Sequence, residues 1–214
     1  MAQLLEGLAQ HFGEREVEQI SRQIGARPDE TRNAIAAALP TILAGLARNT
    51  ETEQGRQNLG AALDRDHDGS LLENLGGLFG GGLFGGESLG GESTAAATPP
   101  APARAIDGGS ILSHIFGNKR DRVGESVSRG SGLDRGQAMK LMMMLAPLVL
   151  AYLGRRKRQE QLNGDQLGEH LQTERRSVEA GGGGFLGRML DQDGDGDFDM
   201  MDVIKFGAGK LFRR

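Results

Sequence analysis

The sequence predicts an all-α protein made of two tandem small helical units that a flexible linker joins. Three observations lead to this fold class. Apolar residues recur at helical spacing, one long segment repeats another, and a Gly/Ala/Pro-rich stretch separates the two copies. No run of residues alternates convincingly between apolar and polar, as a half-buried strand would. We therefore expect no β-sheet.

The composition allows a modest core and excludes several kinds of chemistry. Glycine accounts for 35 of the 214 residues, aromatic residues make up 4%, and tryptophan is absent, so the core must come from Leu, Ile, Met and Ala. The lack of cysteine excludes disulfides, thiolate metal sites and thiol nucleophiles. A net charge of -4 provides no general attraction to nucleic acid or anionic lipid.

The first helical unit is expected over residues 1–75. It opens with an amphipathic stretch instead of the basic, uninterrupted apolar start of a signal peptide, so we expect a cytoplasmic protein. Pro28, Asp29 and Glu30 predict the start of a long helix, because proline suits the first turn and acidic side chains favour the positive end of the helix dipole. Pro40 is expected to kink or split this helix.

Residues 122–155 repeat residues 15–48 at a displacement of 107 positions. Ten of the 34 aligned residues are identical without a gap. A second match, at a displacement of 127, relates residues 186–196 to residues 59–69. The identical pairs of the first match include Ser21 and Ser128, Gly25 and Gly132, Pro40 and Pro147, and Leu43 and Leu150. The chain is therefore interpreted as an internal duplication, in which helices are followed by an acidic loop in each copy.

The remaining boundaries follow from this duplication. Residues 76–105 are rich in glycine and then in alanine and proline, which favours a flexible linker. The second helical unit is expected over residues 106–158, with a helix starting at Asp107. Residues 159–184 form a charged and Gly-rich insertion into the second copy. Residues 185–214 contain an acidic loop and a C-terminal helix.

The sequence DQDGDGDFDMMD, residues 191–202, has the spacing of an EF-hand calcium loop. Such a loop takes oxygen ligands from positions 1, 3, 5, 7, 9 and 12, with glycine at position 6 for a sharp turn. The predicted ligands are Asp191, Asp193, Asp195, Asp197, Asp199 and Asp202, and Gly196 takes position 6. Aspartate in place of glutamate at position 12 leaves the choice between Ca²⁺ and Mg²⁺ open. We predict a Ca²⁺ site whose formation is coupled to local folding; the alternative is a solvated acidic tail.

The first copy carries a degenerate version of this loop. Asp64, Asp66 and Asp68 take positions 1, 3 and 5, but positions 9 and 12 are Leu72 and Leu75, which cannot ligate a metal ion. A structural turn, in which the aspartates cap backbone amides, is the favoured interpretation. A metal site here is kept as the alternative.

Two further features keep other functions open. The basic clusters at 155–158 and 175–176 could contact phosphate in a helical nucleic-acid-binding protein, although no aromatic residues interleave with them. The apolar stretch 141–153 and the basic residues after it make 141–158 a candidate for association with a membrane surface. Because 141–153 is too short to cross a bilayer, a buried core helix is favoured.

Catalytic motifs are absent from the sequence, and none of the histidines pairs with another at metal-ligand spacing. We therefore expect a protein that is not an enzyme. Its expected partner is an unidentified protein or a second copy of the same chain.

Three sequence segments resemble the bacterial DUF937 family: AAALPTILAGLAR at 36–48, DHDGSLLENLGGLFGG at 66–81 and SILSHIFG at 110–117. The resemblance covers residues 1–80 and 106–158. It implies a bacterial origin and a helical fold related to that of YidB-like proteins. Because the family is one of unknown function, the resemblance implies no activity and assigns no site residue.

Overall fold

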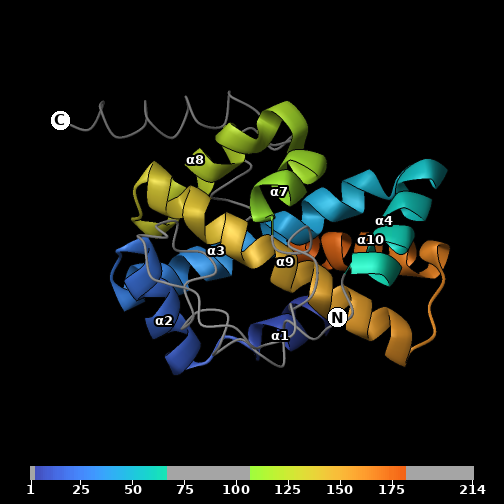
Figure 1. Cartoon of the computed structure of the whole chain (residues 1–214), viewed down its shortest axis with the longest axis horizontal. Helices are drawn as coiled ribbons and strands as arrows, with labels where there is room; N and C mark the ends of the chain where they lie inside the picture. The colour runs from blue at the N-terminus through green and yellow to red at the C-terminus, as the bar shows by residue number, and fades with distance from the viewer. Residues whose placement is uncertain (1–2, 67–106, 182–214) are drawn as a thin grey trace, which may run out of the picture.

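The computed structural model describes residues 3–66 and 107–181, and every regular element in these two ranges is a helix (Figure 1). The elements are α1 (Gln3–Ala9), α2 (Glu14–Ile24), α3 (Pro28–Asn49), α4 (Glu53–Asp66), α7 (Gly108–Phe116), the 3-10 turn η2 (Gly117–Lys119), α8 (Arg120–Ser131), α9 (Arg135–Gln159) and α10 (Gly164–Gly181). The all-α prediction is confirmed. The predicted linker, residues 76–105, and the predicted C-terminal segment, residues 185–214, lie outside the described residues.

The helices of the two described ranges share one hydrophobic core. In Figure 1, α9 crosses the middle of the molecule, with α7 and α8 on one side and α1 and α2 on the other. The long helix α3 packs against α8, α9 and α10, so contacts between the two ranges are extensive. The largest fully buried side chains come from both ranges: Leu8, Ile20, Leu39, Ile42, Leu63, Leu112, Leu141, Met142, Leu145, Leu148, Leu153 and Leu167.

The apolar stretch 141–153 lies in the middle of α9. By length and composition alone, α9 could cross a bilayer, since its most apolar window has a mean hydropathy of 1.4. However, 67% of that window is buried inside the protein. The neighbours of α9 include α3, α7 and α8, and α2 and α4 also pack against it. The stretch therefore supplies the core of this structure, as the core-helix interpretation predicts.

Local sequence signals set the starts of α3 and α7. α3 begins at Pro28 as predicted, and the Arg27 backbone N–H donates to the Glu30 carboxylate at 3.2 Å. α7 begins after Asp107, whose side chain accepts a hydrogen bond from the Ser110 backbone N–H at 3.1 Å. Both contacts satisfy N–H groups that have no partner within the first turn of a helix.

The two repeated prolines lie inside helices without splitting them. Pro40 is within α3 and Pro147 is within α9, and both are buried. Each proline removes one backbone hydrogen bond from its helix. The flanking turns carry buried side chains, among them Leu39, Ile42, Leu145 and Leu148. Packing of these turns into the core holds each helix together on both sides of the proline.

The segment expected as a charged insertion, 159–184, contains α10. Asn163 and Gln166 form a reciprocal cap at its start: the Gln166 backbone N–H donates to Asn163 Oδ1 at 2.8 Å, and the Asn163 N–H donates to Gln166 Oε1 at 2.9 Å. Leu167 and Leu171 are buried at 1% and 0% exposure. This N-x-x-Q capping signal, followed by apolar residues four apart, is visible in the sequence and predicts the helix.

Candidate functional site

The predicted Ca²⁺ ligands Asp191, Asp193, Asp195, Asp197, Asp199 and Asp202 all lie outside the described residues. Of the degenerate loop, Asp64 is the one aspartate whose side chain falls within them, and it sits in the last turn of α4. Its carboxylate forms an ion pair with Lys157 Nζ of α9 at 2.5 Å. Within residues 3–66 and 107–181, no group of three or more His, Asp or Glu side chains is arranged to hold a metal ion.

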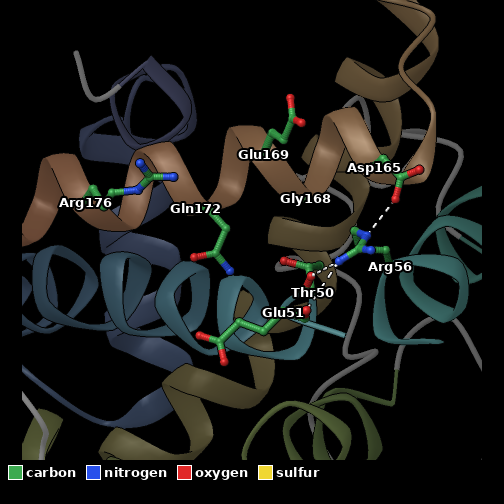
Figure 2. Close-up of a pocket in the computed structure, with 8 residues that line it drawn as sticks. All are labelled: Thr50, Glu51, Arg56, Asp165, Gly168, Glu169, Gln172 and Arg176. Carbon is green, nitrogen blue, oxygen red and sulfur yellow. Dashed lines mark hydrogen bonds and ion pairs between the residues drawn. The ribbon is translucent and has the colours of Figure 1, made fainter. Parts of the chain in front are cut away.

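A pocket of about 610 Å³ lies between α4, α10 and the C-terminal end of α3 (Figure 2). Its lining carries both signs of charge and several uncharged polar groups. The lining residues are Thr50, Glu51, Arg56, Asp165, Gly168, Glu169, Gln172 and Arg176. The pocket thus joins residues from both described ranges.

Arg56 is the central cation of this pocket. Its Nε atom contacts Asp165 Oδ1 of α10 at 2.6 Å, and its Nη1 donates to the Thr50 carbonyl oxygen at 3.1 Å. The last carbonyl groups of a helix have no partner within the helix, so the guanidinium completes the end of α3. A Cβ atom added to Gly168 would lie 2.9 Å from Arg56 Cδ, which shows that the glycine makes room for the arginine.

Two more side chains fasten α10 to the end of α3. Gln172 Nε2 donates to the Ala47 carbonyl oxygen at 2.6 Å, and Arg175 forms an ion pair with Glu51 at 2.7 Å. Figure 2 shows Gln172 pointing from α10 toward α3, whereas Glu169 points the opposite way. Arg175, predicted only as part of a basic cluster, therefore takes part in a contact between helices.

Glu174 of α10 is a buried carboxylate at 3% exposure. Its Oε1 accepts a hydrogen bond from the Leu5 backbone N–H at 2.9 Å, and its Oε2 accepts one from the Leu4 N–H at 3.2 Å. The first N–H groups of a helix lack intrahelical partners and carry partial positive charge, so this negative group satisfies the start of α1. Sequence reasoning missed Glu174, since no local pattern relates residues so far apart.

A smaller polar cluster surrounds Tyr152 on α9. The His11 ring of the α1–α2 connection meets the Tyr152 ring edge-on, with centroids 5.8 Å apart. Burial lowers the pKa of His11 below its usual value, and the positive charge of Arg155 lowers it further. Arg156 Nε lies 2.8 Å from Glu160 Oε1 in an ion pair. The predicted basic cluster at 155–158 is thus partly neutralised by acidic side chains.

The described residues form an all-α protein in which polar side chains repeatedly join the end of one helix to another helix. The comparison with protein families agrees with the sequence motifs. The model of the DUF937 family, described as a bacterial protein of unknown function, matches residues 6–156. The chain therefore belongs to the DUF937 family. Neither the curated proteins nor the solved structures contain a match to it. α10 begins after the matched region.

Proposed function

We propose that this protein is a non-enzymatic interaction module of the DUF937 type that binds Ca²⁺ through residues 191–202. One observation supports the non-enzymatic part: the partly or fully buried charged groups Glu174, Arg56 and Lys157 all have partners that join helices. A general acid or base must be free to exchange a proton with a substrate. Groups held between helices in this way serve the fold instead.

The calcium part of the proposal rests on residue spacing. Six aspartates and Gly196 fill the ligand and turn positions of an EF-hand loop. In the absence of a cation, carboxylates so close together repel one another, so binding would drive local ordering. The loop follows α10 in the chain, and α10 is packed against α3 and α4. Calcium binding would therefore order a segment that follows, in the sequence, a helix of the core.

The partner we favour is a protein or a second copy of the chain, in a cytoplasmic setting. A nucleic-acid partner would need free cations, but Lys157 is paired with Asp64 and Arg156 with Glu160. A membrane partner that binds 141–158 would need apolar side chains that are mostly buried in the core. A fold related to that of YidB-like proteins remains part of this proposal.

Calorimetric titration of Ca²⁺ into the chelator-treated full chain tests the proposal. We expect one saturable site in the wild-type protein and none in the double variant Asp191→Ala, Asp195→Ala. The matched control is Asp64→Asn, which removes a carboxylate from the degenerate loop and should leave binding unchanged. A second site lost in Asp64→Asn would show that the degenerate loop also binds. Absence of binding at millimolar Ca²⁺ would refute the calcium part, and a parallel Mg²⁺ titration gives the ion preference.

Two binding assays test the choice of partner. Retention on DNA that weakens steeply with salt would favour the nucleic-acid alternative. Co-sedimentation with anionic liposomes would favour the membrane-surface alternative. We expect neither salt-sensitive DNA retention nor liposome co-sedimentation, whether Ca²⁺ is present or absent.

A further inference from the structure

The helices of residues 3–66 have counterparts in residues 107–181 that follow in the same order. At a displacement of 107 positions, α1 corresponds to α7, α2 to α8 and α3 to α9, and the turns after α3 and α9 lead to α4 and α10. α2 ends at Gly25 with φ 72°, and α8 ends at Gly132 with φ 85°. Both glycines take the left-handed conformation that commonly ends a helix. We call the two ranges the first half and the second half.

The contacts between the halves are reciprocal at the starts of the long helices. Gln137 near the start of α9 is the counterpart of Glu30 in α3. Gln137 Nε2 donates to the Gly25 carbonyl oxygen at 2.7 Å. In turn, Glu30 Cγ lies 3.7 Å from the position that a Cβ atom on Gly132 would take. Each half therefore places the start of its long helix beside the end of the other half's second helix.

A second reciprocal contact involves Gly45 of α3 and its counterpart Tyr152 of α9. A Cβ atom on Gly45 would lie 2.6 Å from Ile115 Cγ2 in α7, so α3 and α7 approach closely. A Cβ atom on Gly7 would lie 2.2 Å from the Tyr152 hydroxyl, so the Tyr152 side chain of α9 reaches α1. The long helix of each half thus makes a side-chain contact with the first helix of the other half.

The fourth helices follow the same rule. α4 of the first half is joined to α9 by the pair Asp64 and Lys157, and α10 of the second half is joined to α3 by Gln172 and the Ala47 carbonyl. In addition, α3 packs against its counterpart α9, and α4 packs against α10, which follows α9 in the chain as α4 follows α3 although the two are not aligned in sequence. Contacts between equivalent helices are expected where a twofold axis passes through an interface, because a group near the axis meets its own copy.

From these contacts we infer that the chain is a fused pseudo-homodimer, in which the two halves are related by an approximate twofold axis and each half is the binding partner of the other. In a twofold interface, residue i of one subunit contacts residue j of the second, and j of the first contacts i of the second. The glycine and long-helix contacts described above have this form. The inference does not depend on calcium binding. It means that the face of each half that contacts the other half is a binding surface for it.

Cleavage between the halves tests whether they hold each other without a covalent connection. A protease site is placed within 76–105 of the full-length chain, the protein is folded and then cut, and the products are separated by size exclusion. We expect both fragments to co-elute at the position of the uncut 22.8 kDa chain. Separate elution of the two fragments would overturn the inference.

Matched glycine substitutions test the twofold relationship itself. Gly45→Ala and Gly7→Ala each add a methyl group at a close contact between halves, while Gly60→Ala adds one only 3.8 Å from Gly164 Cα, an ordinary contact distance. All three substitutions replace a helical glycine by alanine and so gain the same helix propensity. After cutting, we expect the first two variants to associate about tenfold more weakly than wild type, which corresponds to about 1.4 kcal/mol, and Gly60→Ala to associate at least as tightly.

The Gly7→Ala variant tests whether the two contacts are equivalent. If Gly45→Ala weakens association but Gly7→Ala does not, the contacts are not equivalent and the twofold relationship is wrong. Circular dichroism of each uncut variant shows that the variant is folded before cleavage. The covalent connection keeps the halves at high effective concentration, so the uncut variants should retain the wild-type helix content.

Discussion

Glu174 near the end of the described chain holds the backbone of Leu5 near its beginning, with the Leu5 N–H donating to Glu174 Oε1 at 2.9 Å. The carboxylate is 3% exposed, so the hydrogen bond is made away from water. α10 lies beyond the region that the family model matches, residues 6–156. A helix that follows the matched region therefore fixes the start of α1, whose first residues directly precede that region.

The first prediction concerns this contact. Glu174→Ala removes the acceptor of two buried N–H groups, those of Leu4 and Leu5. Because hydrogen bonds to charged groups contribute more than neutral ones, the free energy of unfolding should fall by about 2 kcal/mol, as measured by urea denaturation. The control Glu169→Ala truncates an exposed carboxylate of the same helix and should change stability by less than about 0.5 kcal/mol. Equal effects of the two substitutions would show that the buried contact contributes nothing.

The second prediction concerns the approach of α7 to α9. A Cβ atom on Gly108 would lie 1.7 Å from the Met143 carbonyl oxygen, a backbone atom that cannot rotate away. Gly108→Ala should therefore force α7 and α9 apart and lower stability by about 3 kcal/mol in thermal unfolding. The neighbouring Gly109→Ala meets no protein atom closer than 3.3 Å and is the matched control. Comparable melting temperatures for the two variants would contradict the observed helix spacing.

The third prediction concerns pH. Burial and the nearby Arg155 hold the pKa of His11 below its ordinary value, so the unfolded chain takes up this proton first as the pH falls. The stability associated with neutral His11 is present above the unfolded pKa of about 6.5 and is lost as the pH falls to the lowered folded value. In His11→Gln this loss should disappear. The midpoints of urea unfolding at about pH 7.5 and about pH 5.5 measure this loss of stability for the wild-type protein and for His11→Gln.

An NMR titration of the His11 ring gives the direct check. A midpoint at or above the ordinary histidine value would show that burial and Arg155 do not act as described.

The fourth prediction concerns the ion pair between Asp64 and Lys157. Asp64 is 56% exposed and Lys157 is 13% exposed, so water screens the pair from one side. A double-mutant cycle with Asp64→Asn and Lys157→Gln should give a coupling of about 0.5–1 kcal/mol that falls as salt is added. A coupling that does not change with salt would indicate a contact other than the ion pair.

Local sequence chemistry was sufficient to predict several elements. Pro28 and the acidic residues after it start α3, and Asp107 starts α7, because caps and dipoles act within one turn. The same kind of signal at Asn163 and Gln166 starts α10, and the sequence analysis overlooked it. The family membership also follows from local motifs. The prediction of Ca²⁺ at residues 191–202 comes from spacing alone and awaits the titration.

From the sequence alone it follows that the protein is helical, that helices begin at Pro28 and after Asp107, and that the chain belongs to the DUF937 family. The shared core of the two halves, the cap that Glu174 places on α1 and the link that Arg56 makes between α4 and α10 are visible only in the folded protein. The difference lies in the distance along the chain over which the interactions act. Helical periodicity and capping depend on residues three or four positions apart, whereas these contacts join side chains more than 100 positions apart, which only packing of the apolar faces brings together.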